Sequence, residues 1–142
     1  MDTAFEIERD IEADLALFLI LFHPLEMLCP TLSQGITNIA TAVTNGIVNG
    51  VGDGKFGVGT NITRQDMAVL IERVLNFKNI EVEKAEVEPF ADAASVADYA
   101  QNAVTNMKAI GLIKGYDNNY NPKDNLTRAE AVKVISLVMK MK

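Results

Sequence analysis

An internal repeat restricts the fold of this chain more than any other feature of its sequence. The segment Gly46-Ile47-Val48-Asn49-Gly50 recurs 65 residues later as Gly111-Leu112-Ile113-Lys114-Gly115. Further along, the spacing becomes 64 residues, so that Thr63-Arg64-Gln65-Asp66 matches Thr127-Arg128-Ala129-Glu130. A repeat of this period predicts two copies of one supersecondary unit, with one loop residue dropped from the second copy.

Each copy contains a helix that begins just after the matched threonine. Apolar residues there follow the i, i+3, i+4, i+7, i+8 spacing of an amphipathic helix. They are Met67, Leu70, Ile71, Val74 and Leu75 in the first copy, and Ala131, Val134, Ile135, Val138 and Met139 in the second. Thr127 with Glu130 predicts a capping box, and Thr63 with Asp66 predicts its shorter version.

A second helix is predicted ahead of each glycine-rich loop, most clearly in the second copy. One apolar stripe is expected to face the core there and to end at Gly111, which predicts a left-handed helix terminus. The stripe comprises Val96, Tyr99, Ala100, Ala103, Val104, Met107 and Ile110. The loops carry turn formers at Asp53 and Asp117. The sequence therefore predicts an all-α fold of helix-loop-helix repeats.

Composition excludes several classes of function. The 142 residues are 49% hydrophobic and carry a net charge of −6 with no basic cluster, so we expect no nucleic-acid partner. A single cysteine, Cys29, and a single histidine, His23, predict no disulfide, no metal site and no cofactor. The residues after Asp117 alternate as in a calcium loop, but Pro122 and Arg128 stand where that loop needs Gly and Glu. No catalytic constellation is present, so we expect no enzyme.

The most apolar run of the chain, residues 15–22, is predicted to be a helix that packs into a core or against a partner. Acidic residues precede it, unlike the basic start of a secretory signal, and it is too short to span a membrane. Pro24 and Pro30 follow it and close the helix. Residues 78–89 alternate Glu with aliphatic residues and predict a solvated acidic linker.

Taken together, the motifs of the second copy resemble those of the S-layer homology domain. In family order they are Phe90 and Asp92, Tyr99-Ala100, Gly111 to Gly115, Tyr120-Asn121-Pro122, and Leu126-Thr127-Arg128-Ala129-Glu130. The first copy matches from about Ile39 through Leu75. It departs at its front, where Leu25, Met27 and Gln34-Gly35 replace the motif residues, and at Gln65-Asp66, where the family usually has Ala-Glu. Tyr99 stands where the family usually has Trp.

The resemblance implies a pseudo-symmetric helical bundle with long glycine-rich loops. We expect an N-terminal segment (1–35) without a family match, a partial first repeat (36–77), the linker (78–89) and a second repeat (90–142). Because such families typically carry three copies, we also expect the chain to associate with itself or with further repeats. The alternative for residues 1–35, a substitute third packing element or foreign sequence, stays open.

By the same resemblance, the function is non-catalytic anchoring at the bacterial cell surface, through an anionic, pyruvylated secondary cell-wall polysaccharide. Arg64 and Arg128 would each bind a carboxylate at a helix start, where the macrodipole otherwise disfavours a cation. Phe56 and Tyr120 would cover an apolar sugar face. Thr63, Asp66, Thr127, Glu130, Asp53 and Asp117 would support the site as caps and loop residues.

Two alternatives remain at the level of the sequence. The arginines can instead donate to loop carbonyls or pair with Asp53, Asp66, Asp117 or Glu130, and so fix the loops onto the helices. The chain can also be a self-assembly or scaffold element of a surface-layer protein, whose loops contact protein rather than glycan. Without the resemblance, internal pairing of the arginines is the favoured interpretation; with it, ligand contact is.

Overall fold

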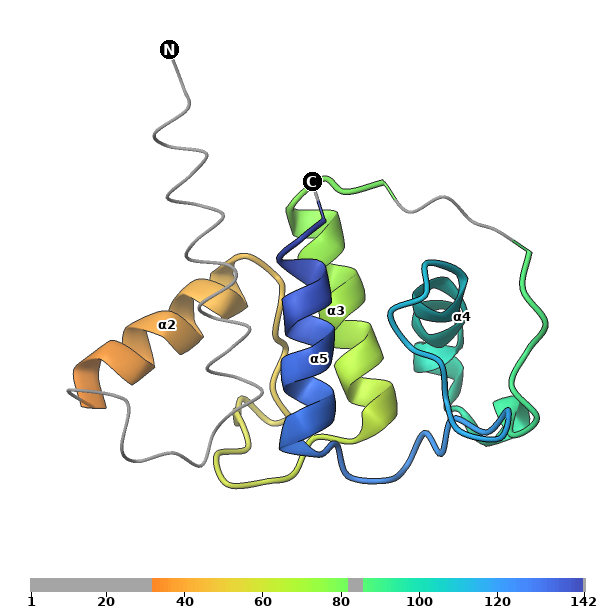
Figure 1. The fold of residues 1–142 in the computed structure, drawn as a ribbon. Coiled ribbons are helices and arrows are strands. Elements are labelled where there is room, and N and C mark those ends of the chain that lie inside the picture. The colour runs from red at the N-terminus through yellow and green to blue at the C-terminus, as the bar shows by residue number, and fades with distance from the viewer. Residues whose placement is uncertain (1–31, 82–85, 142) are drawn as a thin grey trace, which may run out of the picture. The chain divides into compact units, whose positions relative to one another are not determined.

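The computed structural model describes residues 32–81 and 86–141. The chain divides into two compact units, one up to Thr60 and one from Asn61 onward. Four helices lie in the described ranges, α2 (Leu32–Thr44), α3 (Arg64–Phe77), α4 (Gln101–Ala109) and α5 (Arg128–Val138), with two short 3-10 turns, η1 (Ala93–Ser95) and η2 (Asp98–Ala100) (Figure 1). No strand is present there beyond isolated bridges, which confirms the all-α class. The helix predicted at residues 15–22 lies outside the described residues.

The glycine that opens each repeated pentapeptide ends a helix, as the sequence predicts for Gly111. Gly46 and Gly111 have φ of 70° and 75°, in the left-handed region that glycine adopts without strain. After Gly111, the amide of Leu112 donates to Met107 O at 3.0 Å, and after Gly46 the amide of Ile47 donates to Ala42 O at 2.9 Å. These bonds satisfy carbonyls that a helix end leaves without a partner. Both copies thus turn into their loops in the same way.

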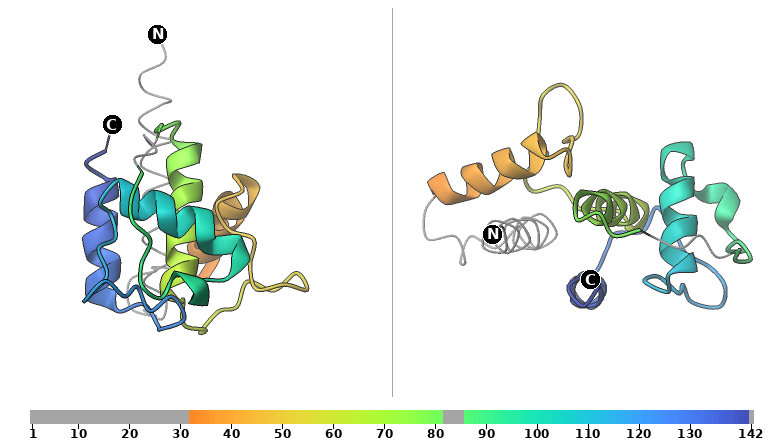
Figure 2. Two further views of the ribbon diagram at one scale, coloured as in Figure 1. Left: turned by 90° about the vertical axis from the view of Figure 1, so that its right-hand side faces the viewer. Right: turned by 90° about the horizontal axis from the view of Figure 1, so that it is seen from above.

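In the unit from Asn61 onward, α3 packs against α4 and η2. Helix α4 runs across α3, whereas α5 runs in the same direction as α3 (Figure 2). The apolar stripe predicted on α3 is buried along its whole length, and each such aliphatic side chain contributes about 1.5 to 3 kcal/mol when it leaves water. On α5 the stripe is buried through Val138, but Met139 follows the helix and is 59% exposed, so its predicted burial is wrong.

The helix predicted over the stripe from Val96 to Ile110 is shorter than expected. Val96 and Ala97 adopt extended backbone angles, and α4 begins only at Gln101. The amide of Ala97 donates to the side-chain oxygen of Gln65 at 3.1 Å instead of to a helical carbonyl. Tyr99 was expected in the core and is 63% exposed, because the interruption places it on η2 rather than on the buried face of a longer helix.

Candidate functional site

The start of α3 is closed by a loop of the second copy. This loop, residues 120–126, lies against residues 62–65, and the amide of Leu126 donates to Ile62 O at 2.8 Å. The first three amides of α3 all donate within the protein. Arg64 N donates to Asp124 O at 2.9 Å, Gln65 N to Pro122 O at 2.9 Å, and Asp66 N to Thr63 Oγ1 at 3.3 Å. The start of α3 therefore has no uncommitted amide for an anion.

The guanidinium of Arg64 is held by the second copy as well. Its Nε donates to Tyr120 O at 2.7 Å, and its Nη1 forms an ion pair with Glu130 Oε1. The guanidinium carbon also lies 5.1 Å from the centre of the Tyr120 ring, within the range of a cation–π contact. Only 20% of the Arg64 side chain is exposed. Arg64 thus ties the starts of α3 and α5 together.

The start of α5 shows the predicted capping box. Thr127 Oγ1 accepts from the amide of Glu130, and Glu130 Oε2 accepts from the amide of Thr127 at 2.9 Å. Since Glu130 Oε1 pairs with Arg64, one carboxylate both caps α5 and binds the neighbouring copy. Arg128, which corresponds to Arg64 in the repeat, is exposed at the first position of α5. The two arginines match in sequence but differ in surroundings.

Tyr120 lies in the core, not at a surface. Its side chain has no exposed area, its ring stacks on Phe90 with centres 5.3 Å apart, and its hydroxyl donates to Arg64 O at 2.5 Å. Burial raises the pKa of this hydroxyl far above its ordinary value. The carboxylate of Asp92 accepts from the amides of Tyr120 and Asn121 at 2.8 and 2.7 Å, which fixes the loop. In this arrangement the Tyr120 ring offers no face to a sugar.

The other predicted residues are turn residues or belong to the other unit. Asp117 and Asn118 have φ of 46° and 56°, the geometry of a type I′ turn, and Asp53 has φ of 50° in the matching loop. Phe56 is half-buried. Asp53 and Phe56 belong to the unit that ends at Thr60. The structure therefore brings together Arg64, Glu130, Tyr120 and the caps in one unit, with Asp117 in a turn of that unit.

A hydrogen-bonded cluster at the start of α3 was not found by the sequence reasoning. Gln65 is 7% exposed, and its amide nitrogen donates to the Tyr99 hydroxyl at 2.9 Å. The Tyr99 hydroxyl donates in turn to Asp66 Oδ1 at 2.6 Å. Partial burial, and then the hydrogen bond to Asp66, raise the pKa of Tyr99. The sequence does contain an indication of this cluster, because the chain departs from the family pattern at all three of its residues, Gln65, Asp66 and Tyr99.

Two kinds of feature are not seen in the part of the chain that the structure describes. Residues 32–81 and 86–141 contain no cluster of three or more side chains suited to hold a metal ion. Within the same ranges, the helices are too short or too polar to cross a bilayer.

Comparison with known proteins places this chain in a family. The model of the S-layer homology domain matches residues 33–68 and 89–132, two copies, of which the first is incomplete at its front. The chain belongs to the S-layer homology domain family, whose members are non-catalytic modules that anchor proteins to the cell surface.

Relatives of known description share this region. The chain is 34% identical over 103 residues to an endoglucanase of Bacillus sp. (strain KSM-635), which covers 71% of the chain and 11% of that protein. It is 33% identical over 88 residues to a cell surface protein of Thermoanaerobacter kivui, covering 61% of the chain and 11% of that protein. A surface-layer 125 kDa protein of Lysinibacillus sphaericus is 29% identical over 102 residues, covering 69% and 8%. The chain thus spans about a tenth of the length of these relatives. No solved structure matches it.

Proposed function

We propose that this chain is a cell-surface anchoring module that binds an anionic, pyruvylated wall polysaccharide, with Arg128 as the residue that contacts the carboxylate. The observation that carries the proposal is the exposure of Arg128 at the first position of a capped helix. A guanidinium binds a carboxylate through two parallel hydrogen bonds, and the positive end of the α5 dipole adds to the attraction. The cell surface is the location that the relatives' descriptions support.

Arg64 takes a structural role in this proposal. To reach a ligand, its guanidinium would have to leave the Tyr120 carbonyl and the Glu130 carboxylate. Losing a hydrogen bond to a charged group costs about 1.5 to 3 kcal/mol, and the stranded carbonyl adds to that cost. A surface carboxylate–guanidinium contact does not offset such a loss. Arg128 therefore contacts the ligand, and Arg64 holds the starts of α3 and α5 together.

An aromatic side chain is also available at the surface. Tyr99 keeps 63% of its area exposed while Gln65 and Asp66 fix its hydroxyl. A fixed, exposed ring can pack on the apolar face of a sugar with little loss of side-chain entropy. We assign this role to Tyr99 in place of Tyr120 and retain Phe56 as a further candidate.

Retention on purified cell-wall sacculi that carry a pyruvylated polymer tests the proposal. We expect the full chain to co-sediment with the sacculi, and Arg128→Ala to reduce retention about tenfold or more. Lys133→Ala removes an exposed cation of the same helix and is the matched control, with retention unchanged. Full retention of Arg128→Ala would refute the assignment of Arg128, and loss of retention in Lys133→Ala would indicate a non-specific charge effect.

One observation favours a second candidate, a self-assembly element. The loop 120–126 binds the start of α3 through backbone hydrogen bonds, so a loop of this type is suited to contact protein. In the repeat, residues 56–62 correspond to this loop and residues 126–129 to the helix start that receives it. Sedimentation at micromolar concentration tests the candidate: a concentration-dependent dimer supports it, and a stable monomer counts against it.

A further inference from the structure

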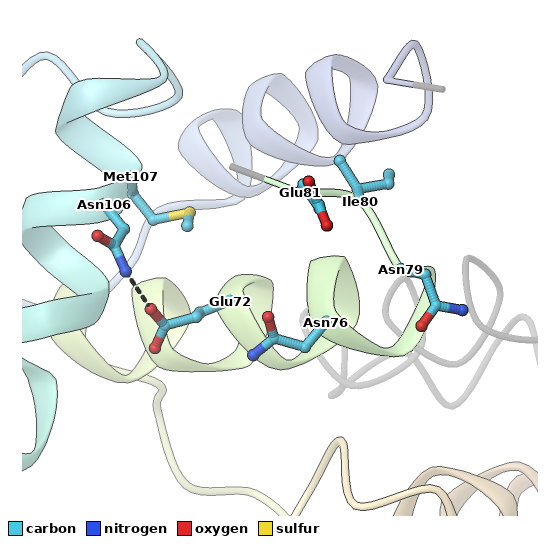
Figure 3. Close-up of a pocket in the computed structure, with 7 residues that line it drawn as sticks. All are labelled: Glu72, Asn76, Asn79, Ile80, Glu81, Asn106 and Met107. Atoms are coloured by element: carbon cyan, nitrogen blue, oxygen red, sulfur yellow. Dashed lines mark hydrogen bonds between the residues drawn. The ribbon is translucent and has the colours of Figure 1, made fainter. Parts of the chain in front are cut away.

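A polar pocket of about 580 Å³ lies between α3 and α4, and neither Arg64 nor Arg128 is among its lining residues (Figure 3). Its lining comes from the later turns of α3, the segment that follows α3 and the second half of α4. The lining residues are Glu72, Asn76, Asn79, Ile80, Glu81, Asn106 and Met107. The volume falls within the range of about 300 to 1,000 Å³ that is typical of small-molecule sites.

The side chains of this pocket suit a ligand rich in hydroxyl groups. Asn106 Nδ2 donates to Glu72 Oε1 at 2.6 Å, which orients both groups and leaves Glu72 Oε2 and Asn106 Oδ1 as acceptors. Asn76 lies one turn after Glu72 on the same face of α3 and adds an amide donor and acceptor (Figure 3). Half-buried Ile80 supplies the apolar part of the lining.

The polar lining is not a requirement of the repeated fold. In the repeat, Ser136 and Lys140 of the second copy correspond to Glu72 and Asn76 of the first. The second copy has neither the carboxylate nor the amide, yet α5 forms and is capped in the same manner. The carboxylate and amides are therefore specific to the junction of α3 with α4.

Charge selects among the possible ligands. Two carboxylates and no basic side chain occur among the lining residues that the structure describes, so an anionic ketal is repelled from this pocket. Sugar hydroxyls, by contrast, donate well to carboxylate and amide oxygens, and the carbon–hydrogen face of a sugar ring packs on an apolar wall.

We propose that this pocket binds a neutral, hydroxyl-rich sugar residue of the same wall polymer whose acidic group Arg128 contacts. The inference rests on the proposed anchoring function and adds a second contact to it. Glu72 and Asn106 accept hydroxyl hydrogens, Asn76 contacts a ring or acetamido oxygen, and Ile80 covers a nonpolar edge. The acidic and neutral parts of the polymer are recognised at separate places on the module.

Titration of the ¹⁵N-labelled full chain with the methyl glycoside of N-acetylglucosamine tests the pocket. We expect chemical-shift changes at the amides of residues 72, 76, 106 and 107, and Asn76→Ala to weaken the affinity about fivefold to tenfold, the loss of one hydrogen bond. Asn76 is exposed on a helix, where alanine is well tolerated, and Ser136→Ala at the position corresponding to Glu72 is the matched control. Absent shifts, shifts unaffected by Asn76→Ala, or shifts with cationic glucosamine alone would each overturn the proposal.

The pocket and the anchoring function can fail separately. If the chain binds sacculi but the neutral glycoside leaves the pocket amides unchanged, the pocket proposal is refuted and the anchoring function stands. If the chain does not bind sacculi, the anchoring function is refuted, and with it the statement that the sugar belongs to a wall polymer.

Discussion

Replacing Arg64 with alanine should destabilise the protein far more than the same change at Arg128. The Arg64 guanidinium donates to a carbonyl whose residue, Tyr120, is fully buried, so its removal leaves that acceptor without this donor. A hydrogen bond from a charged donor contributes about 1.5 to 3 kcal/mol. The ion pair with Glu130 is 35% exposed on the acidic side and adds only about 0.5 kcal/mol after screening.

The contact of the guanidinium with the Tyr120 ring contributes about another 0.5 kcal/mol, because part of Arg64 stays in water. Together these contacts give an expected loss of about 2.5 to 4 kcal/mol for Arg64→Ala. Arg128 is exposed, and its replacement should change the unfolding free energy by less than about 1 kcal/mol.

Urea unfolding followed by circular dichroism measures both effects. We expect the midpoint of Arg64→Ala to fall with little change in the slope, since the fold itself is retained. Arg64→Lys should recover only part of the loss, because an ammonium does not reproduce the geometry of Nε and Nη1. A loss below about 0.5 kcal/mol for Arg64→Ala, or equal losses for both arginines, would refute the structural role of Arg64.

Three further predictions concern the same unit. Gly115→Ala should lower the free energy of unfolding by at least about 2 kcal/mol more than Gly111→Ala, as measured by thermal unfolding. A Cβ at Gly115 would lie 2.5 Å from a backbone carbonyl oxygen, whereas a Cβ at Gly111 would meet nothing within 4 Å. Equal losses for the two variants would contradict this reasoning. Gln65→Ala and Tyr99→Phe should be coupled by about 0.5 to 1.5 kcal/mol in a double-mutant cycle, and additive effects would show that their hydrogen bond is not formed. The pKa of Tyr99 and Tyr120 is raised in the folded state, so stability should be complete below the ordinary tyrosine pKa of 10.0 and decline as the pH rises above it. Urea midpoints measured across that range check this, and a midpoint unchanged to about pH 11.5 would contradict the burial of Tyr120.

The repeat and its local signals could be predicted from the sequence because each depends on neighbouring residues. The capping box at Thr127 and Glu130 requires a spacing of three residues, and the glycine terminus at Gly111 requires one special backbone angle. The apolar stripe of α3 likewise follows from helical periodicity. In these cases the local preference and the tertiary structure agree.

The environments of the arginines and tyrosines could not be predicted in this way. Arg64 and Arg128 have the same local motif, but the docking of the loop 120–126 onto α3 gives Arg64 the partners Tyr120 O and Glu130, which the motif does not predict. Tyr99 is exposed and Tyr120 is buried, the reverse of what the sequence predicts, for a related reason. Gln65 accepts the hydrogen bond of the Ala97 amide, which interrupts the helix, and Asp92 accepts from the Tyr120 amide, which fixes that loop. Contacts between residues far apart in the sequence decide these positions, and the local spacing of a motif does not specify them.

Calorimetric titration with a purified wall polymer tests the binding role of Arg128 most directly. The polymer is used intact and after mild acid has removed its pyruvate ketals, with the wild-type chain and with Arg128→Ala. We predict that removing the ketals weakens binding to the wild type by about tenfold or more and has little further effect on Arg128→Ala, since both changes delete the same contact. Equal losses on ketal removal for the two proteins would show that Arg128 does not contact the carboxylate.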